Sequence, residues 1–305
     1  MFFRSIFLLG LMGFQSAFAE TPAKDKYQTK GDFSAPTLIK DPPKVMIKMW
    51  TSRDGGRVKE NVIDQIDISG LYFDGLLAYD IQYEKTLRFK GLKLRDLISI
   101  YRPLPAGVDH VLLHSKAGMI IPVSIDALRK DTDVFVALAM FDDAKKSWAT
   151  DFQSSVYSQA NKSETLDLKF TGNKIVVGKN WRHTDFAITP WRFFDSLVGV
   201  EYVSSTNHFK TLQPEGGAGN SIGRAVYMRR CQYCHGISDF GAAFGPNFLT
   251  LAKLEKSVLV DRIMSKVTNE PSGKPQTHVN RKMPKQADFK KADAKALADW
   301  LQTWK

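Results

Sequence analysis

The chain contains only two cysteines, and both lie in one short stretch, Cys-Gln-Tyr-Cys-His at residues 231 to 235. Cysteines three positions apart cannot cross-link distant parts of a chain, so folding here depends on packing and not on a disulfide framework. The 305 residues, of which 43% are hydrophobic, suffice for one large or two modest packed domains. The two thiols are therefore candidates for chemistry.

Three kinds of site use cysteines at this spacing. A catalytic dithiol of the thioredoxin type needs a βαβ unit around it, which the neighbouring sequence does not indicate. A structural zinc site needs four ligands, so His235 and a distant histidine would have to replace a second cysteine pair. Covalent haem attachment uses all three residues, because the thiols of Cys231 and Cys234 add to the haem vinyl groups and His235 binds the iron. We expect one haem c, with the other two sites as alternatives.

The first 19 residues have the layout of a secretory signal peptide. Arg4 supplies a positive charge, an apolar run follows from Ile6 to Phe14, and small residues precede a predicted cleavage point after Ala19. An uncleaved anchor or a core helix is the alternative. The run is shorter than the roughly 20 residues that span a bilayer, so we expect cleavage and no stable membrane span. We therefore expect a periplasmic protein. Its net charge of +11 favours binding to acidic proteins or to anionic lipids. We expect no nucleic acid partner.

The remaining chain divides into two regions of different periodicity. Residues 20–43 are polar and predict a flexible arm, and residues 44–213 predict a mostly β domain with short helices at 91–101 and 124–130. A hairpin with an Ala-Gly turn is predicted between residues 110 and 125. Residues 214–221 contain three glycines in four positions and predict a linker, and residues 222–305 have helical periodicity. The fold class is α+β with two domains.

The C-terminal part, from about residue 218 to residue 305, resembles the class I monohaem cytochromes c. The likeness rests on four stretches: SIGRAVYMRRC, with Gly223 and Tyr227; GPNFL at 245–249; RKMP at 281–284; and a helical stripe of Ala294, Leu297, Ala298 and Leu301 beside Trp300 and Trp304. The resemblance implies an all-α domain in which the first and last helices cross, with Gly223 permitting their close approach.

The same resemblance implies the remaining haem contacts. The carbonyl of Pro246 would accept a hydrogen bond from His235, and Met283 would be the second axial ligand, with His278 as its rival and Met264 as a core residue. Two axial ligands leave no iron position open, so the domain would transfer electrons. Residues 216–305 contain 15 Lys and Arg against 7 Asp and Glu, including Lys282 and Lys285 beside Met283. This excess predicts acidic redox partner proteins.

Residues 86–139 and 188–203 resemble the molybdopterin-binding fold of the sulfite oxidase type. Relatives of that kind bind molybdenum through a cysteine, whereas both cysteines of this chain are assigned to haem, and Arg4 is not part of a twin-arginine signal. We therefore expect a version of the fold without molybdopterin, which docks partners or belongs to a larger redox complex. An enzyme that oxidises a small anion, such as a sulfur oxyanion, and reduces the haem is the alternative, and a sensory haem module is a third possibility.

Histidines offer further candidate sites in the β-rich part. His110 and His114 lie four apart on a predicted strand, so their side chains share one side and could hold a metal. His183, with Arg182 and Asp185 nearby, is a candidate for an anion or substrate pocket. Ordinary polar contacts are the alternative for both groups.

Overall fold

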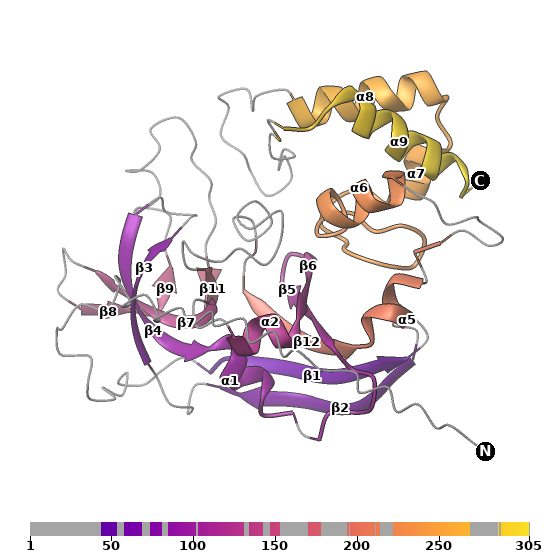
Figure 1. Ribbon diagram of the computed structural model, residues 1–305. Helices are drawn as coiled ribbons and strands as arrows, with labels where there is room; N and C mark the ends of the chain where they lie inside the picture. The colour runs from indigo at the N-terminus through magenta and orange to yellow at the C-terminus, as the bar shows by residue number, and fades with distance from the viewer. Residues whose placement is uncertain are drawn as a thin grey trace, which may run out of the picture.

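The computed structural model describes the ranges 44–53, 58–68, 74–80, 85–101, 103–130, 134–142, 147–152, 170–177, 194, 196–210, 212–213, 222–268, 286 and 288–304. The predicted signal peptide (1–19), arm (20–43) and linker (214–221) lie outside these ranges. The predicted order of a β-sheet-rich N-terminal region followed by a helical C-terminal region is confirmed (Figure 1).

One sheet of five strands has the order β2-β1-β12-β5-β6. β1 (Met46–Arg53) and β12 (Leu197–Val203) pair in parallel, although they are the first and last strands of the region. β2 (Val58–Asp67), β5 (His110–Ser115) and β6 (Ile120–Ser124) pair antiparallel with their neighbours. The β5–β6 pair is the predicted hairpin, and Gly118 in its turn has φ +91°. This conformation suits glycine, which has no Cβ.

A second sheet has the order β11-β7-β4-β3, with β8 (Ser147–Ala149) also beside β7. Its strands are β3 (Asp74–Asp80), β4 (Lys85–Lys93), β7 (Val134–Asp142) and β11 (Lys174–Val177), and the short strands β9 (Asp151–Phe152) and β10 (Phe170–Thr171) pair separately. Every residue of β7 from 134 to 140 is buried, which explains its uninterrupted apolar sequence.

The helix predicted over 91–101 is shorter in the structure. Residues 91–93 belong to β4, and α1 covers Leu94–Ile98. A Cβ at position 91 would lie 1.9 Å from the carbonyl oxygen of Val136, so Gly91 lets β4 approach β7 closely before the helix begins. The second predicted helix is present as α2 (Ile125–Lys130).

One hydrophobic core lies in the sheet region. It contains alternate residues of β5 and β12, which are buried beside residues of α1 and α2. They include Val111, Leu113, Val200 and Tyr202. The hydroxyl of Tyr202 donates to the carbonyl of Ile98 at 2.9 Å. The other side of β5 and β12 carries His114 and Glu201.

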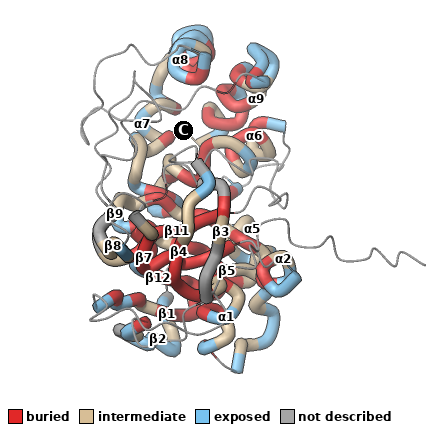
Figure 2. Tube along the Cα trace, turned by 90° about the vertical axis from the view of Figure 1, so that its left-hand side faces the viewer, coloured by how far each residue is buried: buried red, intermediate tan, exposed pale blue. Residues whose placement is uncertain are grey.

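A second core lies between the C-terminal helices, which are α6 (Ile222–Arg230), α7 (Phe248–Ala252), α8 (Lys256–Thr268) and α9 (Lys291–Gln302). The predicted stripe of α9 is buried in it, and buried segments of α6 and α9 stand out in Figure 2. A Cβ at Gly223 would lie 2.1 Å from the carbonyl oxygen of Ala296. The predicted close approach of the first and last helices is therefore present.

The short helix α5 (Ser205–Lys210) connects the two regions. Its N-terminus is held by Asp109, whose carboxylate accepts hydrogen bonds from the backbone N and the hydroxyl of Ser205 at 2.7 and 2.6 Å. Phe209 and the following Leu212 pack into the core of the helical region, and Arg224 of α6 donates to both of their carbonyl oxygens. Packing as well as chain connectivity thus joins the regions.

Candidate functional site

The two cysteines and His235 lie on one turn directly after α6. The backbone N of Cys231 donates to Tyr227 O at 2.8 Å, and those of Cys234 and His235 both donate to Cys231 O, at 3.1 and 2.9 Å. Neither cysteine forms a disulfide, and Cys231 is buried whereas Cys234 is half-buried. The turn therefore gathers the two sulfur atoms and one imidazole within five residues.

Burial determines the ionisation of the first thiol. Loss of hydration raises the pKa of the Cys231 thiol, and the neighbouring Cys234 raises it further, against a smaller opposite effect of Arg230. The neutral thiol is a weak nucleophile compared with the thiolate that redox dithiols use. The environment of Cys231 therefore does not favour the thioredoxin-type alternative.

The ring of His235 is oriented by the carbonyl of Pro246. Nδ1 of His235 lies 2.8 Å from Pro246 O, and because a carbonyl only accepts, this nitrogen carries the proton. Burial lowers the pKa of His235, and the hydrogen bond to Pro246 opposes that shift in part. The resulting neutral ring keeps the lone pair on Nε2, which is the form of histidine that binds a metal.

Residues around the ring restrict its position on several sides. A Cβ at Gly245 would lie 2.4 Å from Cε1 of His235, so a larger residue there would displace the ring. The ring of Phe248 has its centroid 4.8 Å from that of His235. The hydroxyl of Tyr227, whose pKa burial raises, donates to His235 O at 2.7 Å. Sequence reasoning found these positions in the motifs but did not predict that the Tyr227 hydroxyl and Gly245 position the histidine.

Met283 lies outside the described residues, as do His278, Lys282 and Lys285. The nearest described residue after them is Gln286, which is buried. Its backbone N donates to Val267 O at 3.0 Å, and its side-chain oxygen accepts from Arg230 at 3.3 Å. Gln286 is thus fixed beside Arg230, the residue that precedes Cys231.

The histidine pair of β5 has a different environment. Nε2 of His114 lies 2.8 Å from Oε2 of Glu201, and its ring centroid is 4.9 Å from that of Trp50. Burial tends to raise the pKa of Glu201, but the hydrogen bond and the electrostatic attraction of His114 oppose this shift and the pKa is lowered. Within the described ranges, no group of three or more His, Cys, Asp or Glu side chains is arranged to hold a metal ion.

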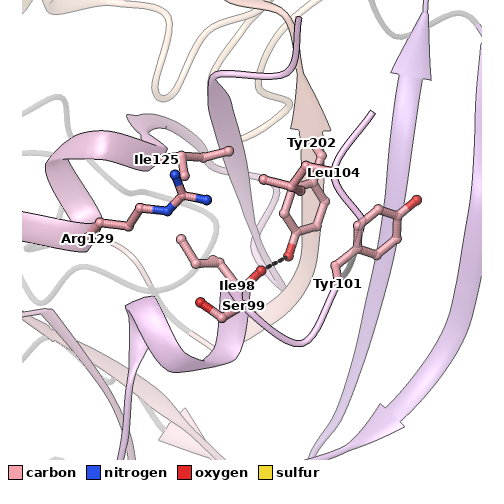
Figure 3. Close-up of a pocket in the computed structure, with 7 residues that line it drawn as sticks. All are labelled: Ile98, Ser99, Tyr101, Leu104, Ile125, Arg129 and Tyr202. Atoms are coloured by element: carbon pink, nitrogen blue, oxygen red, sulfur yellow. Dashed lines mark hydrogen bonds between the residues drawn. The ribbon is translucent and has the colours of Figure 1, made fainter. Parts of the chain in front are cut away.

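Two other features of the sheet region bear on ligand binding. Arg182, His183 and Asp185 lie outside the described residues. A cavity between α1, α2 and β12 is lined by Ser99, Arg129 and Tyr202 among others (Figure 3), but its volume of about 10 Å³ holds roughly one water molecule. It is too small for an organic ligand.

Comparison with known proteins assigns only the helical region. The family model for cytochrome c matches residues 221–305. No curated protein and no solved structure matches the chain.

Proposed function

Because residues 221–305 form a cytochrome c domain, which implies haem-based electron transfer, we propose that this protein carries single electrons through one haem c bound to Cys231 and Cys234. The observation that carries the proposal is the turn at 231–235, where two cysteines outside any disulfide precede a histidine whose Nδ1 is held by Pro246. In the attachment, each thiol adds its sulfur and its hydrogen across one vinyl group, so no external oxidant is needed.

The residues of the site fit that group. His235 offers Nε2 to the iron, and Pro246 fixes the ring that does so. The chemistry that bound haem supplies is a reversible one-electron change at the iron. Cys231 lies in the apolar core of the helices, and this core limits the access of water to the site. The exposure of a haem to solvent is one of the factors that set its reduction potential.

For the second axial position we propose Met283, with His278 as the rival. The sequence places Met283 three residues before Gln286, whose contact with Arg230 lies beside Cys231. Three residues extend over about 11 Å at most, and a connection this short is compatible with ligation by Met283. A Met283→Ala variant should lose the weak long-wavelength absorption of thioether ligation and have a lower potential. An unchanged spectrum, together with an altered spectrum in His278→Ala, would assign the ligand to His278.

We further propose that the protein works in the periplasm after cleavage behind Ala19. None of the described helices is long and apolar enough to cross a membrane. Its redox partners are proposed to be acidic proteins, because residues 216–305 have an excess of eight positive charges. N-terminal sequencing of the mature protein tests the cleavage, and detection of Met1 would contradict it.

For the sheet region we propose a sulfite oxidase-type fold without molybdopterin, serving as a docking part of the redox unit. The support is chemical: both cysteines of the chain lie in the turn at 231–235, so no third thiol exists to bind molybdenum. The alternative is an enzyme that oxidises a sulfur oxyanion. Elemental analysis of protein from its native host decides between them, because one equivalent of molybdenum with sulfite-dependent haem reduction would establish the enzyme.

Mass spectrometry of the denatured mature protein tests the central proposal. One haem should remain attached to the polypeptide after denaturation. The matched controls are the single variants Cys231→Ala and Cys234→Ala. Each keeps one cysteine, so the haem can be bound to the polypeptide through one thioether at most. Free thiols at both positions in protein from a host that makes c-type cytochromes would contradict the proposal.

A further inference from the structure

The two cysteines face different parts of the molecule. Cys231 belongs to the core of the helical region, together with Tyr227 and Phe248. Tyr233, which directly precedes the second cysteine, is 7% exposed and belongs to the core of the sheet region. Cys234 and Phe244 are partly buried against that same core. The attachment turn therefore lies between the two regions.

The part of the sheet region that meets this turn is the β5–β6 hairpin, which points toward the helices in Figure 1. The backbone N of Ile120 donates to Tyr233 O at 3.1 Å, and the backbone N of Ala243 donates to Gly118 O at 2.8 Å. These two hydrogen bonds join the hairpin to the segments on either side of His235. They resemble the main-chain bonds by which an added segment pairs with a strand.

The fit at the tip of the hairpin depends on glycine. Gly118 has φ +91°, and a Cβ there would lie 3.3 Å from the carbonyl carbon of Ala243 and 3.4 Å from the backbone N of Phe244. A larger residue would therefore push the hairpin away from the turn. Gly107 offers a comparison, because its φ is +80° but a Cβ there would have no atom within 4 Å.

We propose that the β5–β6 hairpin packs against the haem within the same molecule. It would cover the haem edge that is attached to Cys234 and keep external redox reagents away from that edge. This inference rests on the proposed function, since a thioether at Cys234 holds one edge of the haem within a few bonds of that sulfur. Whatever covers Cys234 therefore covers that edge. An external protein that approached this edge would meet the hairpin tip, where Lys116 is exposed.

Hydrogen exchange on the haem-loaded wild-type protein gives a first test. The backbone N–H groups of Ile120 and Ala243 have their hydrogen bonds across the junction, so their protection reports docking directly. Slow exchange at both is expected. Exchange at both as fast as at the exposed turn residue Ala106 would overturn the proposal, whatever the haem content.

A matched pair of variants gives the second test, with hexacyanoferrate(III) as the probe. The reagent removes one electron from the ferrous haem and becomes hexacyanoferrate(II). Gly118→Val should lose protection at Ile120 and Ala243, and its second-order oxidation rate should rise about tenfold because the uncovered edge becomes approachable. Gly107→Val carries a similar backbone strain in open space, so both its protection and its rate should match those of the wild type.

Three results separate the proposals. Loss of protection in Gly118→Val with a wild-type oxidation rate would show that the hairpin does not cover the haem edge, and would overturn the inference. Equal rate increases in Gly118→Val and Gly107→Val would assign the effect to backbone strain and overturn it too. Absence of covalent haem would contradict the proposed function instead, while the exchange data would still report whether the hairpin docks.

Discussion

The helical region and the sheet region each contain a partly exposed histidine with one ring nitrogen held by the protein, but only one of the two follows a pair of thiols on a single turn. In the helical region, His235 donates to Pro246 O at 2.8 Å and follows two thiols on the same turn. In the sheet region, His114 is 2.8 Å from the buried carboxylate of Glu201, and its ring lies against Trp50.

The difference shows what a histidine pattern in a sequence can establish. His110 and His114 have the spacing that puts two imidazoles on one side of a strand, yet in the described ranges no three-ligand group forms around them. In contrast, the residues around His235 are close neighbours in sequence, so a local turn is enough to assemble them. A local motif predicts a site more directly than a strand spacing does.

The largest expected effect follows from removing the thiols. A Cys231→Ala/Cys234→Ala variant should contain no covalent haem, because no other thiol exists in the chain. His114→Gln should keep the full haem content, since His114 binds Glu201 and not the haem. Haem-dependent peroxidase staining after denaturing electrophoresis measures both. Loss of covalent haem in His114→Gln would show that the two histidines are not functionally distinct.

A second comparison uses the two close approaches made by glycine. Gly223→Ala in the helical region and Gly91→Ala in the sheet region each place a Cβ within about 2 Å of a carbonyl oxygen, and each should lower the free energy of unfolding by about 3 kcal/mol. Denaturant unfolding, followed by haem absorbance and by far-ultraviolet circular dichroism, measures this. Because α5 and the hairpin join the regions, we expect the two signals to change together in both variants.

The control for that experiment is Gly107→Ala, whose added Cβ meets no atom within 4 Å. Its positive φ alone should cost about 1 kcal/mol. If Gly91→Ala changes only the circular dichroism and Gly223→Ala only the haem signal, then the regions unfold independently.

The junction should also make stability depend on pH. Burial lowers the pKa of His208 below its usual 6.5, and the charge of Glu201 opposes this only in part. The unfolded chain therefore binds a proton more readily, so the contribution of His208 to stability is complete above pH 6.5 and is lost as the pH falls toward its folded-state value. The wild type should lose at most about 1.4 kcal/mol per pH unit through this one group.

A His208→Asn variant should have a smaller pH slope of unfolding free energy between about pH 7.5 and pH 5.5. The groups that face His208 include Glu201, His110 and His114, so His114→Gln is the control for a general effect of the cluster. An identical slope in wild type and His208→Asn would contradict the assignment.

The smallest effect is expected at the start of α5. Ser205→Ala removes one hydrogen bond to the exposed carboxylate of Asp109 but leaves the bond from the backbone N of Ser205. Stability should fall by about 0.5–1 kcal/mol. Thermal unfolding measures this, and a loss above that of Gly91→Ala would show that α5 controls the junction more strongly than the packing indicates.

Much of the fold could be predicted because its signals are local. The apolar runs predicted most of the strands, although not β3, β8 or β9. The Ala-Gly pair predicted the β5–β6 turn, and the period of the C-terminal sequence predicted α6, α8 and α9. The helices α5 and α7 were not predicted, since each is shorter than two turns and has no complete amphipathic period. α5 is held by the hydrogen bonds of Ser205 to Asp109 and by the packing of Phe209 against the helical core. Both contacts join residues that are not neighbours in the sequence.

The candidate site divides in the same way. Cys231, Cys234 and His235 were readable from one motif, and the hydrogen bond from His235 to Pro246, implied by resemblance, is present in the structure. The contact of Tyr233 with the sheet core could not be predicted, because it depends on where a hairpin more than 100 residues earlier comes to lie. Met283 and the group around His183 stay predictions, since they lie outside the described residues.

The burial of Tyr233 has a consequence for engineering chimeras of this protein. A cytochrome domain transplanted from another chain would bring its own residue before the second cysteine. A small polar residue there would leave a void in the sheet core, and the lost burial of an aromatic ring alone is worth about 1.5–3 kcal/mol. A transplanted domain would therefore need a large aromatic residue at position 233. This one side chain determines whether an electron-carrying domain is compatible with the sheet region that supports it.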